Sequence, residues 1–84
     1  MTFYNASLMS DPMTTDTREL IHVNGRERRV PAGLTVAELL EHLDLDPRLV
    51  VVERNATILA RERYATQPVT SGDRYELVHF VGGG

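Results

Sequence analysis

Apolar and polar residues alternate with the period of a β-strand near residue 20. In residues 19–23 (ELIHV), Ile21 and Val23 fall on one face of an extended chain, because successive side chains of a strand point to opposite faces. Asn24-Gly25 follows, and both residues tolerate the positive φ angles of a tight turn. The return segment, 26–30, is rich in charge, which is typical of an exposed edge strand. The pattern predicts a β-hairpin at the edge of a sheet.

A helical period replaces this alternation after Gly33. Four apolar residues recur at i, i+3, i+4 and i+7 and therefore share one helix face: Val36, Leu39, Leu40 and Leu43. Thr35 and Glu38 have the spacing of a capping box, which marks the start of a helix. The charged side chains that should face outward are Glu38, Glu41 and His42. We expect this helix to end before Pro47, because proline disfavours the α conformation of the residue before it.

The second half of the chain predicts two further strands. Residues 49–52 are apolar without alternation, which is typical of a strand buried on both faces or covered by a partner on one. Asn55 is expected at a turn position with positive φ, a short apolar segment follows it, and residues 61–64 should form one helical turn. Ser71-Gly72-Asp73 is a turn cluster that precedes the last strand. Two aromatic residues are expected in the core: Tyr64 and Tyr75.

This order of elements predicts one α+β domain. The apolar faces of the predicted helix and strands are all buried if a single helix lies across a mixed sheet of four or five strands. The first and last strands are then adjacent and parallel in the middle of the sheet. That is the β-grasp, or ubiquitin-like, arrangement. Residues 1–17 are polar and show no apolar period, so they are predicted to be a disordered leader. The domain is expected to span residues 18–81, with residues 82–84 as a flexible glycine tail.

Composition narrows the possible functions. The 84 residues include no cysteine, which excludes disulfides, thiolate nucleophiles and thiolate metal sites. All nine basic residues are arginine, and a net charge of −3 argues against nucleic acid as a partner. No apolar run is long enough to span a membrane and no signal peptide is recognisable, so we interpret the chain as cytoplasmic. The histidines fall on three different elements, and no metal site is expected: His22, His42 and His79.

Five short motifs occur at characteristic intervals along residues 20–84. They are Val23-Asn24-Gly25, Leu34-Thr35-Val36 with Leu39-Leu40, Val52-Glu53-Arg54-Asn55, Arg61-Glu62-Arg63-Tyr64, and His79-Phe80-Val81-Gly82-Gly83-Gly84. This ordered set resembles the ubiquitin-like sulfur carriers, and among them the ThiS family of thiamine biosynthesis. The small subunit of molybdopterin synthase shares the fold and a terminal Gly-Gly. The turn at Glu53-Arg54-Asn55 and the approach His79-Phe80-Val81 look more like ThiS.

The resemblance implies that the chain is a protein substrate and not an enzyme. Its reactive group would be the C-terminal carboxylate of Gly84, carried on the tail of Gly82, Gly83 and Gly84. An E1-like adenylyltransferase, ThiF, would activate this carboxylate with ATP and Mg²⁺. Sulfide equivalents from a cysteine desulfurase pathway would then form a thiocarboxylate, which would deliver sulfur to the thiazole synthase ThiG. The chain itself would bind no cofactor.

Docking of these partners is expected on the face of the last strand that lies away from the helix. If Leu77 points to the core, alternation turns Glu76, Val78 and Phe80 outward, and with Val81 they would form a partner-binding surface beside the tail. The alternative is that a loop or the leader covers them. Three arginines of the edge hairpin either contact a docked partner at the rim of this surface or are solvated charges with no further role: Arg26, Arg28 and Arg29.

Two other functions remain open at this stage. A sulfur carrier of another pathway, such as that of molybdopterin, would use the same tail chemistry, and binding to ThiG would separate the two. A non-covalent ubiquitin-like interaction module, whose terminal glycines are incidental, would keep its function when Gly84 is deleted. Three terminal glycines taken alone also fit a frayed chain end.

Overall fold

The computed structural model describes residues 17–81. The predicted leader up to residue 16 and the predicted tail of Gly82, Gly83 and Gly84 lie outside the described residues. The elements, in which η denotes a short 3-10 helix, are β2 (Arg18–Val23), β3 (Arg26–Pro31), α1 (Val36–His42), η2 (Pro47–Leu49), β4 (Val50–Arg54), β5 (Thr57–Leu59), η3 (Arg61–Arg63) and β6 (Arg74–His79).

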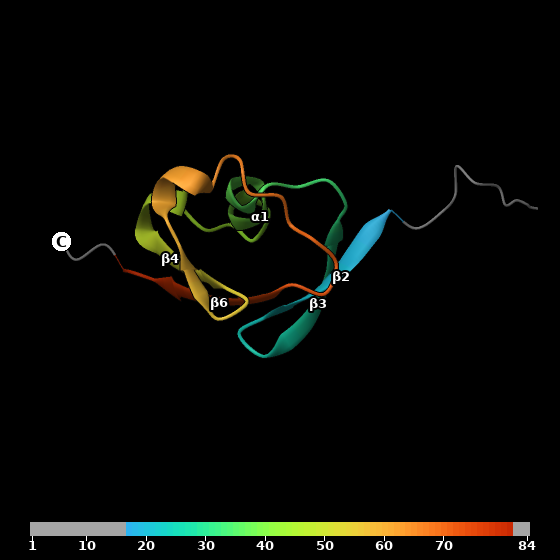
Figure 1. Ribbon diagram of the computed structural model, residues 1–84. Coiled ribbons are helices and arrows are strands. Elements are labelled where there is room, and N and C mark those ends of the chain that lie inside the picture. The colour runs from blue at the N-terminus through green and yellow to red at the C-terminus, as the bar shows by residue number, and fades with distance from the viewer. Residues whose placement is uncertain (1–16, 82–84) are drawn as a thin grey trace, which may run out of the picture.

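Five strands form one mixed sheet, and α1 lies across one of its faces (Figure 1). The strand order is β3-β2-β6-β4-β5. β6 runs parallel to β2 and antiparallel to β4, so the first and last described strands are adjacent in the middle of the sheet. This confirms the predicted α+β class and its arrangement. The short apolar segment after Asn55 forms the fifth strand, β5, which pairs with β4.

The first hairpin is built as the sequence predicts and is also fastened to the last strand. Asn24 and Gly25 have φ angles of 50° and 83°, which a tight hairpin turn requires. The Asn24 side chain then spans 53 positions of sequence: its Oδ1 accepts from the Leu77 amide at 2.7 Å, and its Nδ2 donates to the Leu77 carbonyl at 3.3 Å. One residue therefore sets both the turn and its position against β6.

The helix begins at the predicted capping box. The Glu38 amide donates to Thr35 Oγ1 at 3.2 Å, and the Thr35 amide donates to Glu38 Oε1 at 2.9 Å. The apolar stripe faces the sheet, with Val36, Leu39 and Leu40 fully buried and the last member packed against the core from a half-buried position. The next residue, Asp44, has a φ of 61°, which ends the helix.

Strand β4 has one buried face. Val50 and Val52 are fully buried under α1, whereas Val51 is half-buried and faces away from the helix. The side chains of this apolar run therefore pack in the core on one face of the strand, and on the other face they lie at the surface of the sheet. The described residues bury β4 on one face only, so it is not a strand buried on both faces, and the coverage of its other face by a partner stays a prediction.

Tyr64 completes the edge of β4 where β5 does not reach. Its ring is buried, with 4% exposed, as predicted. Its hydroxyl accepts from the Val52 amide at 3.2 Å and donates to the Val50 carbonyl at 2.8 Å. One phenol thus supplies the two hydrogen bonds that a longer β5 would otherwise make, and it holds η3 against the sheet.

We expect Tyr64→Phe to lower the free energy of unfolding by about 1–3 kcal/mol, because two buried backbone groups lose their partner. The ring, over which Arg61 lies at 5.5 Å, is kept by this substitution. Urea unfolding measures the loss. Thr66→Val is the matched control, since its hydroxyl makes a long bond of 3.4 Å on the surface and its removal should cost under about 0.5 kcal/mol. Equal stability of the Tyr64→Phe variant and the wild type would contradict this role.

Candidate functional site

The last strand carries the chain end out of the sheet. β6 ends at His79, the Phe80 amide still donates to the Leu49 carbonyl at 2.8 Å, and Val81 is 85% exposed. Pairing with the rest of the molecule therefore stops one residue before the end of the described chain. The glycines of the sequence are attached at a point outside the core, at the left of Figure 1.

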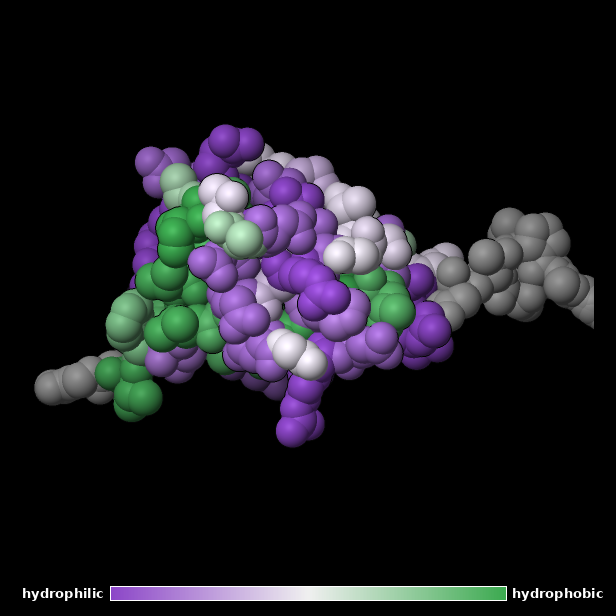
Figure 2. Space-filling view, turned by 60° about the horizontal axis from the view of Figure 1, so that its bottom comes forward, coloured by the Kyte–Doolittle hydropathy of each residue, from purple (hydrophilic) through white to green (hydrophobic). Residues whose placement is uncertain are grey.

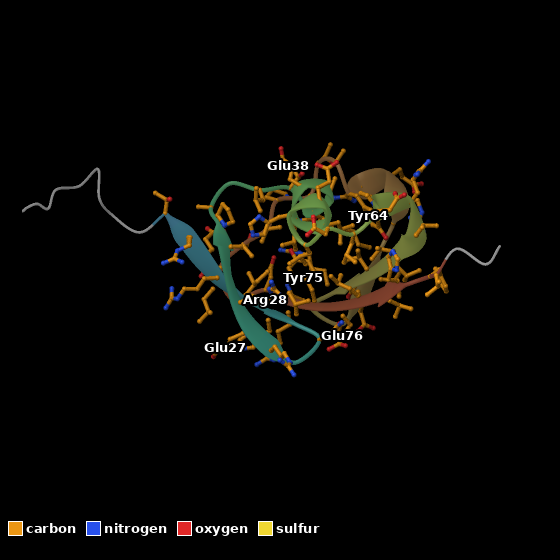
Figure 3. All side chains as sticks on the ribbon, turned by 180° about the vertical axis from the view of Figure 1, so that it is seen from behind. Glu27, Arg28, Glu38, Tyr64, Tyr75 and Glu76 are labelled. Atoms are coloured by element: carbon orange, nitrogen blue, oxygen red, sulfur yellow. The ribbon has the colours of Figure 1, made fainter. Side chains whose placement is uncertain are left out.

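The side chains of β6 alternate as the sequence predicts. Tyr75 and Leu77 are buried, and Glu76 and Val78 are exposed. Tyr75 points between the sheet and α1, while Glu76 lies on the opposite side of the sheet (Figure 3). Phe80, which follows the strand, is 53% exposed. Glu76 and Val78 therefore lie on the face away from the helix, and alternation along the chain places Phe80 on the same face. Val81, the fourth residue predicted to bind partners, is exposed beyond the end of the strand.

Apolar side chains gather on this face next to the chain end. Val78 lies directly opposite Val51 in the β4–β6 pair, and Ile58 of β5 lies in register with Glu53 of β4. We call apolar patch the set of Val51, Ile58, Val78, Phe80 and Val81. Four of its members are the large hydrophobic residues that the described chain leaves exposed, by 53–85%. Figure 2 shows the apolar surface beside the end of the chain.

The arginines of the edge hairpin do not join this patch. Arg28 and Arg26 are in register with Ile21 and Val23, so they stand on the helix side of β3, whereas Arg29 stands on the other side. β2 and β6 separate all three from β4. The structure therefore gives no single arginine cluster beside the predicted docking surface, and the reading of these charges as its rim stays a prediction.

The described residues contain no group of three side chains that could hold a metal ion. His22, His42 and His79 lie on β2, α1 and β6. His22 Nε2 is 3.7 Å from Glu27 Oε2 on the neighbouring strand. No pocket forms in this part of the chain, and none of its helices has the length and apolarity needed to cross a membrane.

A buried carboxylate, which sequence reasoning did not single out, lies at the start of β6. Asp73 is 5% exposed and accepts five hydrogen bonds. Arg54 Nε and Nη2 donate at 3.0 and 3.2 Å, Asn55 Nδ2 at 3.1 Å, the Thr70 amide at 2.9 Å and the Tyr75 hydroxyl at 2.8 Å. This network joins the β4–β5 turn to the last strand.

The network shifts the acidity of two of its members. Burial alone would raise the pKa of Asp73, but the hydrogen bonds from Thr70, Asn55, Tyr75 and Arg54 outweigh it, so that the pKa lies below its usual value. Burial, and then the hydrogen bond to the Asp73 carboxylate, raise the pKa of Tyr75. The network is at the opposite end of β6 from the chain terminus. We assign it a structural role.

Three comparisons with known proteins bear on this geometry. The ThiS family profile matches residues 15–84. The sulfur carrier protein ThiS of Bacillus subtilis is 36% identical over 66 residues, which cover 77% of this chain and all of that one. The crystal structure of a thiamine biosynthesis protein, ThiS, from Geobacter metallireducens has a TM-score of 0.66 and 37% identity, and the match covers 77% of this chain and 99% of that one.

A longer protein also contains a similar segment. The thiazole synthase of Paramagnetospirillum magneticum is 47% identical over 62 residues. The match covers 74% of this chain and 19% of that protein, so the chain spans about a fifth of the length of the relative.

Proposed function

The chain belongs to the ThiS family, the non-enzymatic sulfur carriers of thiamine biosynthesis, and from this premise we propose that the C-terminal carboxylate of Gly84 carries the sulfur. The observation that supports this proposal is the course of the chain after β6. The Phe80 amide still makes a backbone hydrogen bond, Val81 is exposed, and three residues without Cβ follow in the sequence. Fully extended, three residues reach roughly 10 Å. A filament of that kind fits a narrow channel that any side chain would block.

The carboxylate must be activated before it accepts sulfur. An α-carboxyl group has a pKa of about 3.3–3.7, so at neutral pH it is an anion and a poor electrophile. In the proposed sequence its oxygen attacks the α-phosphorus of ATP, the α–β phosphoanhydride bond breaks, and pyrophosphate leaves. A sulfide equivalent then attacks the acyl carbon of the adenylate, AMP leaves, and a thiocarboxylate remains on Gly84.

Partner enzymes supply the machinery for these steps. The described residues form no pocket, and the sequence has no glycine loop followed by lysine that would bind phosphates. We therefore assign ATP and Mg²⁺ to an E1-like adenylyltransferase of the ThiF type, and the sulfur to a cysteine desulfurase pathway. No cofactor is assigned to the chain itself, and the reactions are placed in the cytoplasm.

The acceptor of the sulfur is proposed to be a thiazole synthase of the ThiG type. The support is the relative named thiazole synthase, which contains a segment 47% identical to this chain. Both partners must admit the tail, so both are expected to cover the surface from which it leaves. That surface is the apolar patch together with Glu76, and burying exposed Val78 and Phe80 against a partner would favour association.

Intact-mass analysis tests the proposal. The full chain is incubated with ATP, Mg²⁺, the adenylyltransferase and a sulfur donor, and the expected product is heavier by one oxygen-to-sulfur exchange. Omission of ATP is the control and should leave the mass unchanged. Addition of the thiazole synthase should return the original mass as thiazole forms. An unchanged mass under conditions that load another ThiS protein would reject the proposal, and loading without thiazole formation would assign the carrier to another pathway.

A further inference from the structure

Two glutamates lie side by side on the face of the sheet away from α1. Glu53 of β4 and Glu76 of β6 are direct partners in the antiparallel pair, so their side chains project to the same face. Their Cβ atoms are then about 5 Å apart. Glu76 is exposed and Glu53 is half-buried. No ion pair within residues 17–81 includes either carboxylate.

The acidic pair borders the apolar patch. Val51 and Val78, the next pair of residues on this face, lie two positions along β4 and β6, and Ile58 is in register with Glu53. Arg74 is exposed two positions before Glu76, but no ion pair in the described chain joins them. Two carboxylates directly opposite each other repel and therefore reduce the stability of the sheet. Their placement is unfavourable for the free protein and suits a surface that meets positive charge.

We propose that the Glu53–Glu76 pair binds arginine or lysine side chains of the thiazole synthase, and that this pairing strengthens binding of the partner that receives the sulfur. The proposal rests on the proposed function, because it needs a protein that covers the apolar patch while the tail is inside it. Glu76 and Val81 are five positions apart, which is roughly 17 Å along an extended chain. A single protein–protein interface of ordinary size covers both.

The charge of this face suits the thiazole synthase better than a second copy of the chain. A two-fold contact through this face would bring two acidic pairs into one interface and double its negative charge. A partner with an apolar surface and exposed cations removes water from the patch and neutralises the glutamates at once. Charge pairs of this kind affect both the rate of association and the choice of partner.

The test replaces both carboxylates by neutral amides of the same shape. We expect Glu53→Gln with Glu76→Gln to weaken binding to the purified thiazole synthase roughly tenfold or more at low salt. The matched control is Glu41→Gln with Glu62→Gln, which changes the net charge equally at exposed positions of α1 and η3, and which should alter the dissociation constant less than about twofold. Titration calorimetry at two salt concentrations measures both.

Two further readouts separate charge recognition from damage to the fold. The thermal midpoint of the Glu53→Gln, Glu76→Gln variant should equal or exceed that of the wild type, because the repulsion is removed. Glu53→Arg with Glu76→Arg should reverse the salt dependence, so that added salt strengthens its weak binding while it weakens that of the wild type.

The outcomes distinguish this inference from the function on which it rests. If the wild type neither gains sulfur nor binds the synthase, the proposed function fails. If the wild type does both and the Glu53→Gln, Glu76→Gln variant binds as tightly as the control, the inference about charge is overturned and the function stands. A wild-type dimer in sedimentation that Val78→Ser dissociates would show that a second copy covers this face, and would also overturn the inference.

Discussion

Deletion of Gly84 is expected to abolish sulfur loading while the domain stays folded. The deletion moves the carboxylate back by one residue, about 3.5 Å, from the position that the adenylating site would require. Misplacement of a reacting group by about 1 Å costs on the order of a hundredfold in rate, so the mass of the shortened chain should not change in the loading assay. The thermal midpoint should be unchanged, because Gly84 follows a Val81 that is already 85% exposed.

A variant of unaltered length tests the same idea chemically. Conversion of the terminal acid to an amide keeps all three glycines but removes the oxygen that attacks ATP, and it should also prevent loading. Both altered chains should still bind the thiazole synthase through the apolar patch. Removal of residues 2–12 is the control for loss of a chain end and should leave loading intact. A Gly84-deleted chain with full biological activity would instead support a non-covalent interaction module.

Features set by neighbouring residues were predictable from the sequence. The hairpin depends on Asn24-Gly25, whose positive φ angles are a property of the dipeptide itself. The capping box depends on Thr35 and Glu38, three positions apart. The outward direction of Val78 followed from alternation once Leu77 was placed in the core. In each case the deciding interactions lie within a few residues of one another.

Contacts between distant segments gave no comparable signal. Arg54, Asn55 and Asp73 were each recognisable as members of turns, but only the folded chain brings them within hydrogen-bond distance across 18 or 19 positions. The pairing of Glu53 with Glu76 depends on the register of β4 against β6, and a shift of one residue would turn one of the two to the other face.

Asp73→Asn should be the most destabilising conservative change in the described chain. The amide keeps the shape of the side chain but removes the negative charge that pairs with Arg54, and its NH2 group, a hydrogen-bond donor, faces groups that are themselves donors. Breaking a buried ion pair on one side costs about 3–5 kcal/mol, and we expect about 3 kcal/mol because Arg54 is 25% exposed. For a domain of this size that lowers the thermal midpoint by roughly 12–24 °C.

The pH dependence of this loss identifies the carboxylate as its source. Because the pKa of Asp73 is lower in the folded protein than its usual 3.8, its contribution is complete above that value and disappears as the pH falls through the folded pKa. The difference in unfolding free energy between the wild type and the Asp73→Asn variant should therefore be constant from about pH 5 to 8 and shrink below about pH 4. Asp46→Asn is the control, since its partner Arg48 is 86% exposed and the thermal midpoint should barely move.

The hydrogen-bond network around Asp73 lies at the far end of β6 from the tail. The Asp73→Asn variant should therefore load sulfur normally at temperatures well below its thermal midpoint. Loss of loading in the folded variant would contradict the structural role that we assign to it.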